Sequence, residues 1–244
     1  ISTQGNQSKQ YLVYAILTSV KTTINLRGLD LFTYARLPIY LVITALLMSA
    51  AKAEPEPVTA LTTAEGFFHV VTDQANGRIL LDIPKSSQPF ILQLSLPRGL
   101  GSNDIGLDRG RLGDTKLVYF KRLGKKVLLT QKNTDFRANS AFQAEKNAVT
   151  EAFASSVIWG FQVESETEES YRIDYTEYLL SDSYGISRIL EDAEQGKYSI
   201  NSERSAALLA RLGNFPDNTE LEAIITLTGN AQAREIRQVA PDSS

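Results

Sequence analysis

The sequence predicts an α+β fold in which an antiparallel sheet dominates, with β-hairpins, one central helix and further short helices. Short β-rich runs alternate with turn residues, which is typical of antiparallel strands. Near the middle, an Ala- and Glu-rich segment instead has apolar residues at helical spacing. The chain of 244 residues is 43% hydrophobic and 22% charged, so it is long enough and apolar enough to bury a sizeable core.

Two hairpins and one further strand are expected in the first half of this sheet. The runs "GFFHVVTD" and "RILLDI" flank an Asn76-Gly77 pair, which favours a tight hairpin turn. "FILQLSL" at 90–96 predicts a third strand. "TKLVYFKR" at 115–122 and "KKVLLTQK" at 125–132 predict a second hairpin.

The second half mixes helices with strands. Residues 140–160 predict the central helix, opened by a Ser140–Gln143 capping box, with an apolar stripe of Phe142, Val149, Phe153 and Val157. "FQVESETEESYRIDYT" predicts two strands around an acidic turn, and "TEYLLSDS" and "GISRILEDAEQG" predict short helices. In "ELEAIITLTG" the alternation places four residues on one strand face: Leu221, Ala223, Ile225 and Leu227.

The first 65 residues predict an exported protein. Residues 31–53 have the parts of a signal peptide: Arg36, an apolar run over Leu37–Ala50, and the small-x-small pattern Ala51–Ala53. Cleavage after Ala53 predicts a periplasmic or secreted chain with no stable membrane anchor, because the run is shorter than the about 20 residues of a spanning helix. We expect residues 1–30, which begin without Met, to be an upstream or non-native segment of little structural weight. Residues 54–65 then form a flexible lead-in, and 66–244 the α+β domain.

Composition excludes several kinds of chemistry. Cysteine is absent, so the chain has no thiol nucleophile, disulfide or Cys-type metal site. With one histidine, His69, and no HExxH, G-x-S-x-G or Walker pattern, we expect no catalytic residue, no metal ligand set and no cofactor in this chain. His69 itself alternates with apolar strand residues and is expected to be a packed strand histidine. A net charge of −3 argues against a nucleic-acid partner.

The glycine-rich stretch Arg98–Asp114 is the one candidate site. Its polar residues define a structural or interface loop: Asn103, Asp104, Asp108, Arg109, Arg111 and Asp114. A calcium loop is one interpretation, but the spacing departs from the EF-hand pattern and the arginines would repel the cation. We expect Arg109 and Arg111 to pair with the carboxylates and fix the loop; contact with a ligand, substrate or neighbouring domain stays open.

Three segments carry a family resemblance: "GLGSNDIGLDRGRLGDTKLVYFKRLGKKVLL", "AEKNAVTEAFASSVIWGF" and "FPDNTELEAIITLTG". From Glu65 to Asp242 the chain resembles an N-terminal domain of unknown function that precedes the catalytic part of exported bacterial zinc-dependent metalloproteases of the Met-zincin type. The resemblance implies that zinc and the catalytic residues belong to a later part of the parent protein, which has no counterpart here.

The function expected from this resemblance is non-catalytic. The chain would be a fragment of the parent that packs against, or shapes the substrate cleft of, the downstream metalloprotease domain of the same polypeptide, with a peptide as the parent's substrate. One alternative is an independent periplasmic module that binds peptide or glycan in a preformed pocket. Another is a small hydrolase that uses carboxylates alone, although the sequence distinguishes no carboxylate pair.

Overall fold

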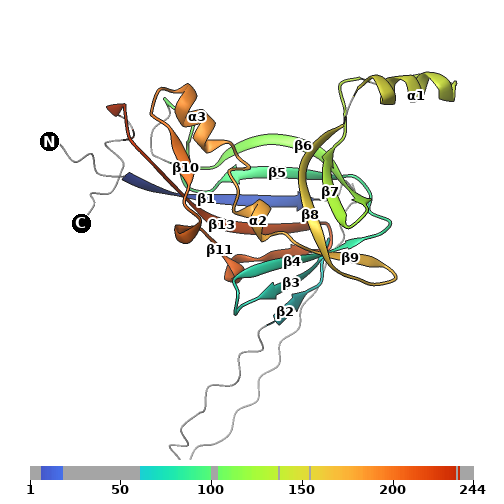
Figure 1. Ribbon diagram of the computed structural model, residues 1–244, viewed down its shortest axis with the longest axis horizontal. Helices are drawn as coiled ribbons and strands as arrows, with labels where there is room; N and C mark the ends of the chain where they lie inside the picture. The colour runs from blue at the N-terminus through green and yellow to red at the C-terminus, as the bar shows by residue number, and fades with distance from the viewer. Residues whose placement is uncertain are drawn as a thin grey trace, which may run out of the picture.

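The strands form one curled antiparallel sheet (Figure 1). The computed structural model describes residues 7–18, 61–99, 104–136, 138–153, 155–234 and 236, with residues 7–18 and Thr150 described by their backbone. Within these residues the sheet has 13 strands, in the order β10-β13-β1-β5-β6-β7-β8-β9-β4-β3-β2, and β11 and β12 also pair with β13. The strands are β1 Gln7–Thr18, β2 Leu61–Ala64, β3 His69–Asp73, β4 Arg78–Pro84, β5 Phe90–Leu96, β6 Arg111–Leu123, β7 Lys126–Gln131, β8 Ser156–Glu166, β9 Ser170–Asp174, β10 Tyr198–Ile200, β11 Ala206–Ala207, β12 Gly213–Phe215 and β13 Asn218–Gly229.

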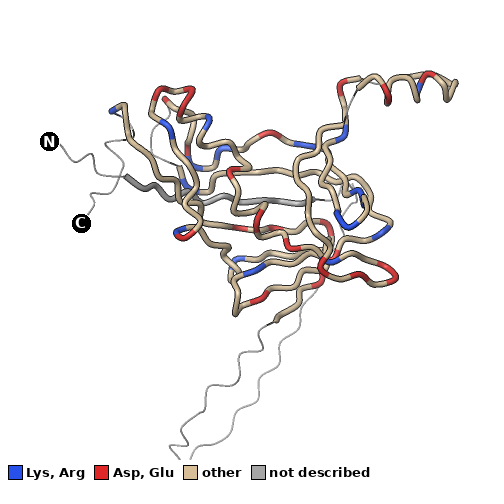
Figure 2. The backbone as a smooth tube through the Cα atoms, in the orientation of Figure 1, with Lys and Arg blue, Asp and Glu red and all other residues tan. Residues whose placement is uncertain are grey.

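The hairpins follow the sequence pattern closely. β3 and β4 pair around Gly77, whose φ of 65° lies in the left-handed region that a glycine adopts without strain. β6 and β7 pair around Gly124, with a φ of 59°. β8 and β9 pair around the acidic turn, where Figure 2 shows acidic residues in red at the hairpin tip. Both predicted hairpins, the strand at 90–96 and the β8–β9 pair are therefore confirmed.

Aromatic side chains fill the inside of the curl. Phe90, Phe120 and Phe161 come from β5, β6 and β8, and consecutive ring centroids lie 5.4 and 6.2 Å apart. Tyr175 stacks on Phe161 at 5.4 Å and is fully buried. The four β13 residues predicted to share one face are each 0% exposed: Leu221, Ala223, Ile225 and Leu227. The β5–β6 register shifts between Gln93 and Ser95, where Leu94 of β5 faces two residues of β6, Gly113 and Asp114, as in a β-bulge.

The two ends of the sheet meet at Asn214. Its Nδ2 donates to the carbonyls of Ala64 at 2.8 Å and Phe68 at 2.9 Å, which flank the β2–β3 connection. Its Oδ1 accepts from the Thr219 hydroxyl of β13 at 2.7 Å. Gly66 permits this approach, because a Cβ there would lie 2.2 Å from Asn214 Oδ1. One amide side chain therefore ties β2–β3 to β12–β13.

The helices are short and differ in their surroundings. α2 (Thr176–Leu179) and α3 (Ile186–Asp192) each bury apolar side chains in the core. The 3-10 turns η1 (Ser202–Arg204) and η2 (Leu209–Arg211) connect β10, β11 and β12. By contrast, α1 (Gln143–Ala152) projects away from the sheet as an arm between β7 and β8 (Figure 1). Among the described residues, no helix is both long and apolar enough to cross a membrane.

Helix α1 is shorter than predicted. The expected helix ran from 140 to 160, but Val157 and Trp159 lie in β8, where they pair with Thr130 and Leu129 of β7. β-branched and aromatic residues favour a strand wherever a neighbouring strand offers hydrogen bonds. The predicted capping box is also wrong: Phe142 is the N-cap, without a side-chain cap, and Ser140 accepts from the Phe142 amide instead. Because helices are so few, the fold is mostly β, and only the dominance of antiparallel strands is confirmed for the predicted α+β class.

Two expectations about the N-terminal third also need correction. Leu61–Ala64, placed in the flexible lead-in, forms β2 and pairs with β3. Residues 1–30 were expected to carry little structural weight, yet Gln7–Thr18 forms β1, hydrogen-bonded to β13 along its whole length. The reason is that β5 and β13 both offer a free edge to which an extended segment can hydrogen-bond. The predicted signal peptide at 31–53 lies outside the described residues.

Asn214→Ala tests the closure of the sheet. We expect a loss of about 1–3 kcal/mol in the free energy of unfolding, because the carbonyls of Ala64 and Phe68 lose their donor. Urea unfolding measures it. The matched control is Asn218→Ala, since within the described residues Asn218 Nδ2 donates to the Glu220 carboxylate, two residues away on the same strand. Equal losses in the two variants would contradict the role given to Asn214.

Candidate functional site

The glycine-rich loop between β5 and β6 is held by apolar anchors. Leu107 is 0% exposed and Ile105 is 7% exposed, so both side chains belong to the core. The Gly110 amide donates to the Leu96 carbonyl at 2.7 Å, which ties the loop's end to its beginning. Gly99 allows the two ends of the loop to lie close together, because a Cβ there would lie 2.3 Å from the backbone nitrogen of Arg109. The loop thus folds back over the core.

The predicted loop residues do not converge on a ligand site. Asn103 lies outside the described residues, and Asp104, Arg109, Arg111 and Asp114 are exposed. Within the described residues, neither arginine forms an ion pair with Asp104, Asp108 or Asp114, so the pairs expected from the sequence are not what holds the loop. Asp108 is partly buried, and its Oδ1 has no hydrogen-bond partner among the described residues.

Arg111 links the loop to the α2–α3 connection instead. Its guanidinium lies against Gly106, 3.5 Å from the position of an added Cβ. It also acts on Tyr184: burial raises the pKa of the Tyr184 phenol, and the nearby Arg111 guanidinium opposes that rise. Tyr184 in turn packs on Gly113 of β6. These contacts are structural, and they bring no pair of acid and base groups together.

His69 belongs to a polar ladder across three strands. Its Nδ1 lies 2.7 Å from Asp82 Oδ2 of β4, and Arg172 of β9 donates from Nε and Nη2 to the same carboxylate at 2.7 Å each. The other ring nitrogen, Nε2, lies 3.3 Å from Glu65 Oε1. The bonds from Arg172 hold the pKa of Asp82 below its usual range, although partial burial of the carboxyl opposes this and His69 reinforces it.

This ladder lacks the parts of a catalytic centre. In hydrolases a His–Asp pair orients the histidine as a base for a hydroxyl nucleophile. Here the second ring nitrogen of His69, Nε2, instead faces the Glu65 carboxylate. In the described part of the chain, no group of three His, Cys, Asp or Glu side chains could hold a metal ion. The ladder therefore fastens β3, β4 and β9 together, in keeping with a packed strand histidine.

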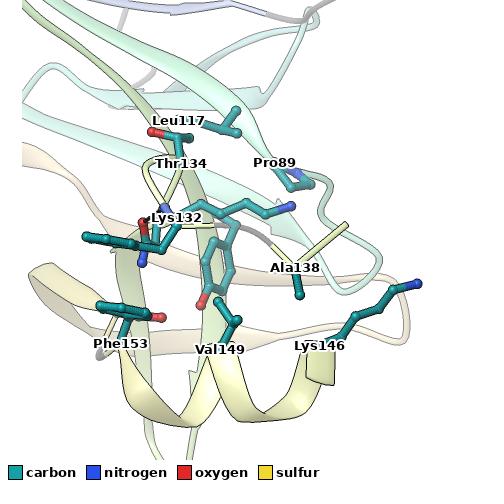
Figure 3. A pocket seen from close by; sticks show the side chains of 12 residues that line it. Pro89, Leu117, Lys132, Thr134, Ala138, Lys146, Val149 and Phe153 are labelled. Carbon is teal, nitrogen blue, oxygen red and sulfur yellow. Dashed lines mark hydrogen bonds between the residues drawn. The ribbon is translucent and has the colours of Figure 1, made fainter. Parts of the chain in front are cut away.

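A cavity of about 820 Å³ separates α1 from the sheet (Figure 3). Val149 and Phe153 point into it from α1, and Lys132 and Leu117 line the opposite wall (Figure 3). The rings of Phe136 and Phe153 stack with their centroids 3.9 Å apart and form part of the lining. A second hollow of about 370 Å³ shares these two rings.

The lining of this cavity suits binding rather than catalysis. Among the described residues of its lining, the charged side chains are the cations Lys132 and Lys146, and no carboxylate is present to act as a general base. Large apolar side chains on and around α1 stay exposed: Phe136 at 53%, Phe142 at 69%, Phe153 at 37% and Val157 at 53%. An exposed apolar surface of this kind marks an interaction site in a soluble protein. We call these four residues and α1 the arm surface.

In the sequence, the apolar residues of the arm form only a stripe at helical spacing. Phe142, Val149 and Phe153 were on that stripe, but their spacing does not tell which neighbour covers them. Lys132 and Phe136 were missed because they lie in the connection between β7 and α1, where no periodic pattern exists. Asp82 and Arg172 were missed as well, since only the β4–β9 register brings them together.

Within the described residues, the fold and the site define a class of protein. It is predominantly β, with an exposed apolar arm and no assembled catalytic group. Residues 110–242, more than half of the chain, match the family model described as a domain of unknown function, DUF5117. The chain belongs to this family. Comparison with curated proteins and with solved structures found no match.

Leu107→Ala tests the view that apolar anchors hold the glycine-rich loop. We expect the free energy of unfolding to fall by about 2–5 kcal/mol, because a fully buried leucine leaves a cavity. Arg109→Ala is the matched control and should change it by less than about 0.5 kcal/mol, since Arg109 is exposed. Thermal and urea unfolding measure both. A larger loss from Arg109→Ala would restore the arginine-paired loop expected from the sequence.

Asp82→Asn tests the polar ladder through its pH dependence. Because the folded pKa is lowered, the Asp82 carboxylate stabilises the fold above its ordinary pKa of about 3.9, and this stabilisation is lost as pH falls through the folded value. We expect the variant to be less stable by about 1–3 kcal/mol at pH 7, with the gap closing below about pH 4. Urea unfolding at several pH values measures the gap. Glu168→Gln, at the exposed hairpin tip, removes the same charge and should show no such gap.

Proposed function

We propose that this chain is the non-catalytic N-terminal domain of an exported zinc-dependent metalloprotease. In this proposal the domain packs through the arm surface against the downstream catalytic part of the same polypeptide. The observation that carries the proposal is α1, which projects from the sheet and leaves Phe142 69% exposed. Isolated apolar side chains on a surface are ordinary, but four around one projecting helix favour a partner that covers them.

The chemistry of the described residues is consistent with a domain that shapes a site rather than forming one. The parent's zinc would need several His or carboxylate ligands, and the described residues have no such group, so they do not fit the ion. We therefore assign zinc and catalysis to the downstream part. The cavity behind the arm, with Lys132 and Lys146, lies where a partner docked on α1 would cover it.

The export step of this proposal rests on the sequence of residues 31–53. Cleavage after Ala53 would leave a periplasmic or secreted domain that starts at Glu54. N-terminal sequencing of the protein recovered from the periplasm or medium of an expressing bacterium tests this step directly.

Hydrogen exchange tests the arm as a docking surface. The coding DNA beyond residue 244 is first read for an HExxH segment, and the longer polypeptide is then compared with the 244-residue chain. We expect the amides of α1 to exchange at least about tenfold more slowly in the longer polypeptide, because a partner covers the helix. The double substitution Phe142→Ser and Phe153→Ser should abolish this gain.

The matched control for that experiment is Leu123→Ser, at the β6–β7 turn, where the side chain is 56% exposed but distant in sequence from the arm. It should leave the protection of α1 unchanged. Unaltered exchange of α1 between the two chain lengths would contradict docking through the arm. Metal-dependent peptide cleavage by the purified 244-residue chain would contradict the non-catalytic role itself.

The cavity also favours one alternative, an independent module that binds peptide or glycan. Its volume of about 820 Å³ and its mixed lining of aromatic rings and lysines are typical of a ligand pocket. Calorimetric titration of peptides and glycans into the 244-residue chain separates the two functions. Saturable binding that Phe153→Ser removes would favour the module over the docking domain.

A further inference from the structure

Strand β1 joins two strands that do not pair with each other within the described residues. It pairs with β13 from Gln7 to Thr18 and with β5 from Tyr14 to Thr18, antiparallel in both cases. β5 and β13 are therefore parallel to one another, and within the described residues no register pairs them directly. We call the space between β5 and β13, which β1 fills, the strand slot.

The occupant of the slot comes from outside the rest of the fold. Residues 19–60 separate β1 from β2, whereas every other strand lies between Leu61 and Gly229. The family match begins at residue 110 and does not include β1. The strand that completes the sheet thus belongs to a segment that one cut in the connection would detach.

The two strands that flank the slot present buried apolar side chains and backbone hydrogen-bonding groups, which suit an extended peptide. On β13, Leu221, Ala223 and Ile225 have 0% exposure, and the register sets them opposite Ala15, Val13 and Tyr11 of β1. On the other wall, Leu92 and Leu94 of β5 are buried as well. An empty slot would leave two rows of backbone amides and carbonyls without partners, and buried groups of this kind cost free energy.

Closing the slot without a strand is unfavourable. β5 and β13 lie two strand spacings apart across β1, so to pair directly they would have to approach by about one spacing, roughly 4.8 Å. The clamp at Asn214 holds β12 and β13 to the β2–β3 connection, so β13 is not free to shift. The geometry therefore favours a replacement strand over a contracted sheet.

We propose that the strand slot is a peptide-binding site, which takes up an extended, proline-free segment with apolar residues opposite Leu221, Ala223 and Ile225 once β1 is released. Binding adds a strand between the edges of β5 and β13, so backbone hydrogen bonds supply affinity. The buried side chains of Leu221, Ala223 and Ile225 supply specificity. The proposal rests on the proposed function in one respect: cleavage after Ala53 would detach β1 from the exported domain.

The experiment starts from the folded 244-residue chain. Residues 54–59 are replaced by the recognition sequence of a site-specific protease, and the purified protein is cut in the native state. A fluorescent peptide with the sequence of residues 7–18, QSKQYLVYAILT, is then added in excess. We expect it to co-elute with the body of the cut protein and to displace the N-terminal fragment. The uncut protein should take up less, because its tethered β1 competes intramolecularly.

The matched control is the same peptide with Val13→Pro, whose ring is not tolerated in the middle of a sheet, and it should bind at least about tenfold more weakly. Three outcomes overturn the proposal: equal uptake of both peptides, an N-terminal fragment that never exchanges, or a body that loses the fragment and does not bind the peptide. None depends on α1 exchange in the longer polypeptide, so failure of the docking proposal and failure of the slot are separately visible.

Discussion

The backbone pairing of β13 is the constraint on which the rest of the structure depends. One edge of β13 pairs with β1 along all 12 residues, and the other edge pairs in turn with β10, β11 and β12. Its buried row, from Leu221 to Leu227, faces the core that the aromatic residues of β5, β6 and β8 fill. Thr219, near its start, holds Asn214 and so closes the curl. A strand engaged on both edges and on its inner face cannot move without opening the whole sheet.

Two surfaces of this closed body suit partners, the arm surface as it stands and the strand slot once β1 is released, and they differ in kind. The arm surface presents apolar side chains on a projecting helix, which suits a partner that covers it by side-chain packing. The strand slot presents backbone hydrogen-bonding groups, which suits a partner that is itself extended. A domain placed beside a larger catalytic part could use both surfaces, whereas an independent binding module would need only the cavity or the slot. The family assignment is consistent with either role.

Sequence reasoning worked where the determinants are local. The turns at Gly77 and Gly124 need positive φ, and the strands beside them alternate, so both hairpins could be predicted closely. It failed where distant residues decide. Val157 and Trp159 continue a helical stripe, yet pairing with Thr130 and Leu129 draws them into β8. In the glycine-rich loop the sequence draws attention to the polar residues, whereas the tertiary structure shows buried Ile105 and Leu107 anchoring the loop on the core.

The sequence by itself determined that the chain is rich in antiparallel strands, that β13 has one apolar face, and that no cysteine or clustered histidine is available for chemistry. Only the tertiary structure decided which edges those strands pair with, that α1 stands away from the sheet, and that Asp82 meets both His69 and Arg172. The physical reason is the range of the interactions. Turn geometry and side-chain alternation act between near neighbours in the chain, whereas strand pairing and burial depend on segments that only the completed fold brings together.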